Sequence, residues 1–185
     1  SCSFSLDELG AGIRNEVTGF RCCSDGPPPV LAATPADSVD VPLGGEVGAP
    51  VLAFALPVDG GDAVTERTLA KGVSVVTLVK PKDPSSRNEL AALERVREDL
   101  KKAGVRLFVF DVDRAPPATG GDTPAYKGTI LIDRDQITMG VFSTRRLPAT
   151  YLVDRKGVVQ YAAPGGMSGA VDAFVPKAKE LAAAR

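Results

Sequence analysis

The sequence predicts an α/β domain, and three observations lead to this prediction. Two runs have the length and composition of buried strands: residues 73–79, which are rich in β-branched side chains, and residues 105–112, which are rich in valine and phenylalanine. Between them, residues 84–103 place apolar side chains at spacings of three and four, with charges in between, which predicts an amphipathic helix closed by Gly104. The order strand, helix, strand favours a parallel pair joined by a right-handed crossover.

The remaining elements follow from shorter patterns. A Pro/Gly loop is expected over residues 115–128, between the second buried strand and the next short one. The other expected elements are a strand at 51–56 ending at the turn Asp59-Gly60-Gly61, a helical turn at 65–71, a strand at 130–132, a helix at 135–142, a hairpin of 149–153 and 158–162 around Asp154-Arg155-Lys156-Gly157, and a helix at 169–184 that Pro176 kinks or restarts.

Length and composition predict one main domain with an extension. The chain has 185 residues, 44% of them hydrophobic, which is enough for a packed core. Residues 26–50 contain six prolines and four glycines, which resist helix formation. The predicted organisation is a cysteine-containing N-terminal arm at 1–25, a Pro/Gly-rich linker at 26–44 and the α/β domain at 45–185.

All three cysteines, Cys2, Cys22 and Cys23, lie in the arm. Adjacent cysteines pair only with local strain, so a disulfide from Cys2 to Cys22 or Cys23 is the expected pairing. Such a bond favours an extracytoplasmic location, periplasmic or at the cell surface. The alternative is three ordinary thiols in a reducing compartment.

Several function classes are excluded by composition. The chain has no histidine, which removes imidazole-based triads, zinc sites and pH switches. The net charge is −1 and tryptophan is absent, so no nucleic-acid footprint is present. No apolar run is long enough to span a membrane, and the start at Ser1 without a leader indicates a mature or excised fragment. The oligomeric state is left open.

From about residue 45 onwards the chain resembles the thioredoxin-fold redoxins, which include extracytoplasmic thiol-disulfide oxidoreductases and thiol-specific antioxidant proteins. The resemblance rests on GEVGAPVLAFALP, on ELAALERVREDLKKAGVRLFVFDVD and on LPATYLVDRKGVVQY. It implies a three-layer α/β/α fold with a central mixed sheet. It also implies that Pro148, in the LPAT segment, follows a cis peptide bond.

The same resemblance shows what the chain lacks. Redox-active members carry a Cys-x-x-Cys pair at the start of the first long helix, where the helix N-terminus stabilises the thiolate. Here Asp83, Pro84, Ser85 and Ser86 occupy those four positions, with Asp83 and Ser86 at the cysteine positions. The resemblance therefore implies a degenerate active site.

Three interpretations of this segment remain open. The first is an ordinary helix start, either Asp83 as N-cap before Pro84 or a capping box of Ser86 with Glu89. The second is a serine nucleophile, Ser86 or Ser85, activated by Lys80 or Lys82. The third is a site for an anion or a peptide end at the helix N-terminus.

Two charged groups are weaker candidates. Asp111 and Asp113 could bind a hard cation together with Asp133 or Asp135, although aspartates at strand ends are typical of turns. No metal site or cofactor is predicted. The basic pair Arg145-Arg146 precedes Pro148 and would flank the groove, where it could favour an acidic partner.

The arm carries a second resemblance. Its segment RNEVTGFRCCSD is similar to the C-terminal tail of the formylglycine-generating, sulfatase-modifying domain family. It implies a longer protein in which such a domain precedes the thioredoxin-like one. A chance match in a cysteine-containing arm is the alternative.

The predicted function is binding without redox chemistry. In the family, the backbone beside the cis proline pairs with an extended substrate chain. The groove of residues 83–86 with Leu147 and Pro148 is therefore expected to bind a protein or peptide segment. One alternative is a thiol-disulfide oxidoreductase that uses Cys22 and Cys23. Another is a structural module of a larger protein.

Overall fold

A five-stranded mixed sheet forms the centre of the molecule, in a computed structural model that describes residues 44–58, 61–114, 126–166 and 170–184. The strand order is β5-β4-β3-β6-β7. Strands β3 and β4 are parallel, as are β4 and β5, whereas β6 runs antiparallel to β3 and β7. The bounds are β3 (Ser74–Val79), β4 (Arg106–Asp111), β5 (Ile130–Ile132), β6 (Ala149–Val153) and β7 (Val159–Pro164).

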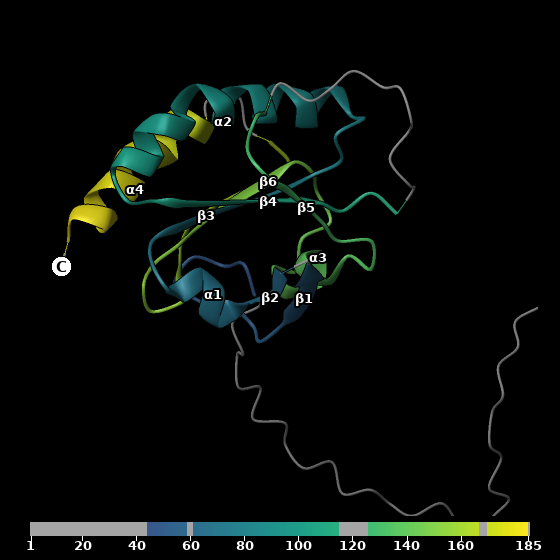
Figure 1. The fold of residues 1–185 in the computed structure, drawn as a ribbon, viewed down its shortest axis with the longest axis horizontal. Coiled ribbons are helices and arrows are strands. Elements are labelled where there is room, and N and C mark those ends of the chain that lie inside the picture. Colours follow the sequence, from purple (N-terminus) through teal and green to yellow (C-terminus); the bar gives the residue numbers. More distant parts are fainter. Residues whose placement is uncertain (1–43, 59–60, 115–125, 167–169, 185) are drawn as a thin grey trace, which may run out of the picture. The chain divides into compact units, whose positions relative to one another are not determined.

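The two faces of the sheet are covered by different elements (Figure 1). Helices α2 (Pro84–Lys102) and α4 (Ala170–Ala183) cover one face, and Leu90, Leu93 and Phe174 pack there on the sheet. The other face carries α1 (Glu66–Ala70), α3 (Ile137–Val141) and a small antiparallel pair, β1 (Ala55–Val58) with β2 (Gly61–Thr65). This is the three-layer arrangement expected from the sequence.

The first long helix forms as the periodicity predicts. Its leucines at positions 90, 93 and 100 are fully or almost fully buried, while the charged positions between them lie towards solvent. Pro84 stands at the first helical position, and Gly104 follows the last turn with a φ of 78°, which glycine adopts without steric cost. The predicted parallel crossover from β3 through α2 to β4 is confirmed.

Three expectations need correction. The strand expected at 51–56 begins only at Ala55, because the backbone of Val51 donates to the Gly157 carbonyl instead. The turn expected at Asp59-Gly60-Gly61 ends sooner, since Gly61 opens strand β2, whose first three residues are exposed and show no alternation. Helix α4 continues through Pro176 as one element, so the proline does not restart it.

Strand register brings several loops to one end of the sheet. Leu78 pairs with Ala149, so the residues after β3 and those before β6 lie at that end. Val79 pairs with Asp111, which places the residues after β4 there as well. The start of α2, the Leu147–Pro148 segment and Arg114 therefore share the same end of the sheet. No described helix is long and apolar enough to cross a membrane.

Candidate functional site

The start of α2 adopts one of the two capping registers that the sequence allowed. Asp83 is the N-cap residue, with extended backbone, and Pro84 is the first helical residue. The capping box of Ser86 with Glu89 is wrong, because both residues lie inside the helix. The Asp83 carboxylate makes no capping hydrogen bond, and the Asp83 carbonyl accepts from the Arg87 N–H at 3.0 Å.

Ser86 is completely buried, and its hydroxyl oxygen accepts a hydrogen bond from the backbone N–H of Lys80 at 3.1 Å. The Lys82 ammonium lies 3.8 Å from the Asp113 carboxylate. No recorded contact in the described part of the chain joins a lysine ammonium to Ser85 or Ser86. The geometry gives Ser86 a structural partner and gives neither serine a base.

A buried series of hydrogen bonds, which sequence reasoning missed, links the first half of α2 to the sheet. Glu89 is almost fully buried, and its carboxylate accepts from the Thr150 hydroxyl at 2.8 Å. The Thr150 hydroxyl also lies 3.3 Å from that of Thr77, so α2 is bonded to β6 and β6 to β3. Burial raises the pKa of Glu89, and the hydrogen bond from Thr150 opposes part of that rise. A glutamate close to the buried Leu90 in the helical pattern was the available signal.

The segment before β6 lies at the same end of the sheet as the start of α2. The peptide bond between Leu147 and Pro148 is cis, as the resemblance implied. Pro148 is buried, its carbonyl accepts from the Gly165 N–H at 2.8 Å, and Gly166 lies against its ring, where an added Cβ would come within 2.6 Å. Leu147 is half-buried, and among the described residues its backbone N–H and carbonyl make no hydrogen bond. This segment therefore offers an unpaired backbone edge.

Asp111 and Asp133, at the strand ends, accept hydrogen bonds from backbone N–H groups. Asp133 is fully buried and accepts from the N–H groups of Ile137 and Thr138 at 2.9 and 2.8 Å, and from the Thr138 hydroxyl at 2.5 Å. Asp111 accepts from the N–H of Asp113, and burial raises the pKa of Asp111. Within the described ranges, no group of three or more metal-ligating side chains is present.

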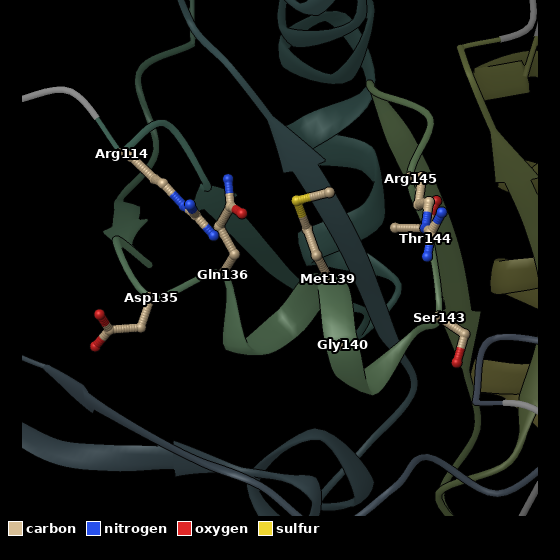
Figure 2. A pocket seen from close by; sticks show the side chains of 8 residues that line it. All are labelled: Arg114, Asp135, Gln136, Met139, Gly140, Ser143, Thr144 and Arg145. Carbon is tan, nitrogen blue, oxygen red and sulfur yellow. The ribbon is translucent and has the colours of Figure 1, made fainter. Parts of the chain in front are cut away.

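A pocket of about 460 Å³ lies beside α3, at the same end of the sheet (Figure 2). The sequence pointed to Arg145 here, but it gave no reason to join Arg145 with Arg114, which is distant in the chain. The lining residues are Arg114, Asp135, Gln136, Met139, Gly140, Ser143, Thr144 and Arg145.

Comparison with known families identifies the fold's lineage. Residues 47–162 match the model of the AhpC/TSA family. The chain belongs to the AhpC/TSA family. A search among curated proteins gives no significant match. The family range includes the start of α2, the Leu147–Pro148 segment and the pocket, so the whole candidate site lies within it.

Solved structures of thioredoxin-fold redoxins share this architecture. A protein assigned as the thiol:disulfide interchange protein DsbE of Chlorobium tepidum is 17% identical, with a TM-score of 0.60, covering 74% of this chain and 97% of its own. The bacterioferritin comigratory protein of Xanthomonas campestris is 20% identical, with a TM-score of 0.56 and coverage of 70% and 92%. The reduced 2-Cys peroxiredoxin of Plasmodium vivax is 19% identical, with a TM-score of 0.57 and coverage of 72% and 94%. These likenesses show the thioredoxin-like fold.

The predictions for the N-terminal arm concern residues outside the described ranges. They are the arm at 1–25, the linker up to residue 43, the thiols of Cys2, Cys22 and Cys23 and their pairing, and the second family resemblance. All of them stay predictions. The same holds for residues 115–125 of the loop expected at 115–128.

Proposed function

We propose that this protein is a redox-inactive member of its family that binds an extended protein segment in the groove between the start of α2 and Leu147. The observation that carries the proposal is the backbone of Leu147. Its N–H and carbonyl lack partners among the described residues, beside a strand that is otherwise fully paired. An extended chain satisfies such groups by adding main-chain hydrogen bonds.

The absence of a thiol in the domain supports the redox-inactive part of the proposal. The sequence from residue 24 onwards contains no cysteine, so neither a Cys-x-x-Cys pair nor a peroxidatic thiol exists in the family-matched region. Ser86 stands at one of the two positions and is held by the Lys80 backbone. A hydroxyl in this role forms no disulfide.

Redox inactivity is tested by the reduction of insulin disulfides with dithiothreitol as electron donor. The full chain is compared with the variant that combines Cys22→Ser and Cys23→Ser. Both are expected to show only the dithiothreitol background. Turnover by the full chain that the variant lacks would establish the alternative function, a thiol-disulfide oxidoreductase that uses the arm cysteines.

Segment binding is tested with peptides selected from a displayed library and measured by fluorescence anisotropy. Ser85→Arg places a long side chain at the exposed first turn of α2, where it obstructs the groove without entering the core. Ala173→Arg makes the same change at an exposed position of α4 and serves as the matched control. We expect Ser85→Arg alone to weaken binding, and the amide resonance of Leu147 to shift on peptide addition. Equal binding by both variants would contradict the groove.

The clustering of cysteines in the arm supports an extracytoplasmic location as part of the same proposal. Mass spectrometry of the protein purified under thiol-blocking conditions tests it. A disulfide between Cys2 and Cys22 or Cys23 is the expected result, and three alkylated thiols would argue for a reducing compartment.

A further inference from the structure

The pocket beside α3 lies between two arginines that arrive from different strands. Arg114 follows β4, and Arg145 precedes β6. Figure 2 shows Arg114 and Arg145 on opposite sides of Met139, with the side chain of Arg114 reaching towards Gln136. The lining of the pocket therefore has a guanidinium on either side of the Met139 thioether (Figure 2).

Neither guanidinium is bonded to a described residue. The neighbouring Arg134 donates to the Asp113 carbonyl at 2.6 Å. By contrast, the side chains of Arg114 and Arg145 make no ion pair or hydrogen bond with any described residue, and both residues are exposed. The lining also contains one carboxylate, that of Asp135, which points away from the other side chains in Figure 2. The net charge of the side chains that line the pocket is therefore positive.

The backbone around the pocket is held in an uncommon conformation at two points. Gln136 and Ser143 are the non-glycine residues with positive φ in the described chain, at 57° and 46°, and both line the pocket. Such conformations persist where the surrounding structure enforces them, and they cluster at ligand sites. The Gln136 side-chain amide donates to the Val112 carbonyl at 3.0 Å. The Asp133 carboxylate accepts from the Ile137 N–H in the first turn of α3. The backbone at Gln136 and at the start of α3 is thus held by hydrogen bonds within the fold.

Guanidinium groups recognise carboxylates through paired, charge-assisted hydrogen bonds. In an extended segment every second side chain points to the same face, so two acidic residues with one apolar residue between them both face the pocket. Their carboxylates can then reach the guanidiniums on either side of the half-buried Met139 (Figure 2). Arg145 is also two residues from Leu147, whose backbone forms the proposed binding edge. An extended segment bound at Leu147 would therefore bring its neighbouring side chains to this pocket.

We infer that the Arg114–Arg145 pocket binds carboxylate side chains of an acidic, extended protein segment. The inference rests on the proposed function and specifies its partner: acidic residues alternate with apolar ones in the bound segment. Ser143 and Thr144 add hydroxyl groups beside Arg145, which suits hydrogen bonding to carboxylate oxygens.

The test uses the full chain and three fluorescein-labelled probes. The first is a short peptide of alternating glutamate and valine, the second has glutamine in place of glutamate, and the third is glutarate linked to the dye. Variants Arg114→Gln and Arg145→Gln remove the two charges in turn. Arg95→Gln removes the same charge from an exposed position of α2 and is the matched control. Thermal unfolding confirms that all three variants are folded.

We expect the glutamate peptide to bind, and Arg114→Gln and Arg145→Gln each to weaken it about tenfold, while Arg95→Gln has little effect. Addition of the glutamate peptide should also shift the amide resonances of Gly140 and Ser143. Binding of the glutamate and glutamine peptides with equal affinity, or equal binding by all variants, would overturn the pocket inference and leave the groove intact. Arginine-dependent binding of glutarate without peptide binding would overturn the protein-segment ligand. No binding of any probe would overturn the acidic-segment inference, whereas the proposed function would still be decided by the library-selected peptides.

Discussion

The start of α2 and the segment before β6, which border the proposed groove, differ in how their polar groups are used. At the start of α2, Ser86 is bonded to the Lys80 backbone and Glu89 to Thr150, so the polar side chains beneath this wall belong to the core. On the α3–β6 side, the backbone of Leu147 and the guanidinium of Arg145 have no partner among the described residues. The contacts on the α2 side therefore support the domain, and the proposed binding role rests on the groups of the other side. Substitutions should separate these roles, because stability will depend on the first set of contacts and affinity on the second.

The largest loss of stability is expected on substitution of Asp133, whose carboxylate caps α3. Asp133→Ala leaves three donors without their acceptor, two of them in buried hydrogen bonds, and we expect it to lower the free energy of unfolding by about 2–4 kcal/mol. Chemical denaturation measures the change. Asp135→Ala, at an exposed position two residues later, is the control, with an expected change within about 0.5 kcal/mol. Equal effects would mean that α3 does not depend on its buried cap.

A smaller loss is expected at the α2 wall. Ser86→Val puts a larger, apolar side chain at a fully buried position and removes the acceptor of the Lys80 N–H, at a cost of about 1–3 kcal/mol. Ser85→Val, in the exposed first turn, should change stability by less than about 0.5 kcal/mol. If Ser86→Val were as stable as the native chain, the hydroxyl would have no structural role, and the assignment of this wall to the core would fail.

Substitution of Glu89 should stabilise the fold at neutral pH, in contrast to the losses expected at Asp133 and Ser86. A carboxyl group whose pKa is raised on folding binds its proton more tightly in the folded state, so its ionisation destabilises the fold as pH rises from the unfolded pKa through the folded one. Glu89→Gln keeps an oxygen acceptor for Thr150 and removes the charge. Its melting temperature should exceed that of the native chain at neutral pH, and the difference should vanish below about pH 4.5. A difference that does not change with pH would show that Glu89 does not titrate in this way.

The smallest change is expected at the N-cap. An aspartate that caps a helix through its side chain contributes about 1 kcal/mol, but Asp83 makes no such bond. We therefore expect Asp83→Ala to cost less than about 0.5 kcal/mol in thermal unfolding. A loss of a full kcal/mol would indicate a capping bond that forms in solution.

Sequence patterns predicted the sheet and its helices well, because the signals there are local. The β6–β7 hairpin follows from Asp154 and Gly157 between two apolar runs, and α2 follows from its leucine spacing. The β1–β2 pair was missed at its second strand, where Gly61 and its neighbours are exposed and show no alternation.

The candidate site was less accessible to sequence reasoning, because its contacts are distant in the chain. Glu89, in α2, matched a capping-box spacing, yet its partner Thr150 lies on strand β6. Asp133 was considered for a cation, whereas in the structure its carboxylate is occupied by backbone donors of α3. The pairing of Arg114 with Arg145 depends on the register of the sheet, which no local pattern specifies.

The turn between β6 and β7 has a practical consequence. Arg155 in this turn donates to the carbonyls of Ala182 and Ala184, so the end of α4 is fastened to the hairpin. Since β6 begins at the groove and reaches the turn at its other end, this anchorage lies at the far end of the strand from Leu147. A biotin or sensor-chip linker attached after residue 185 would therefore immobilise the protein with its groove facing the solution.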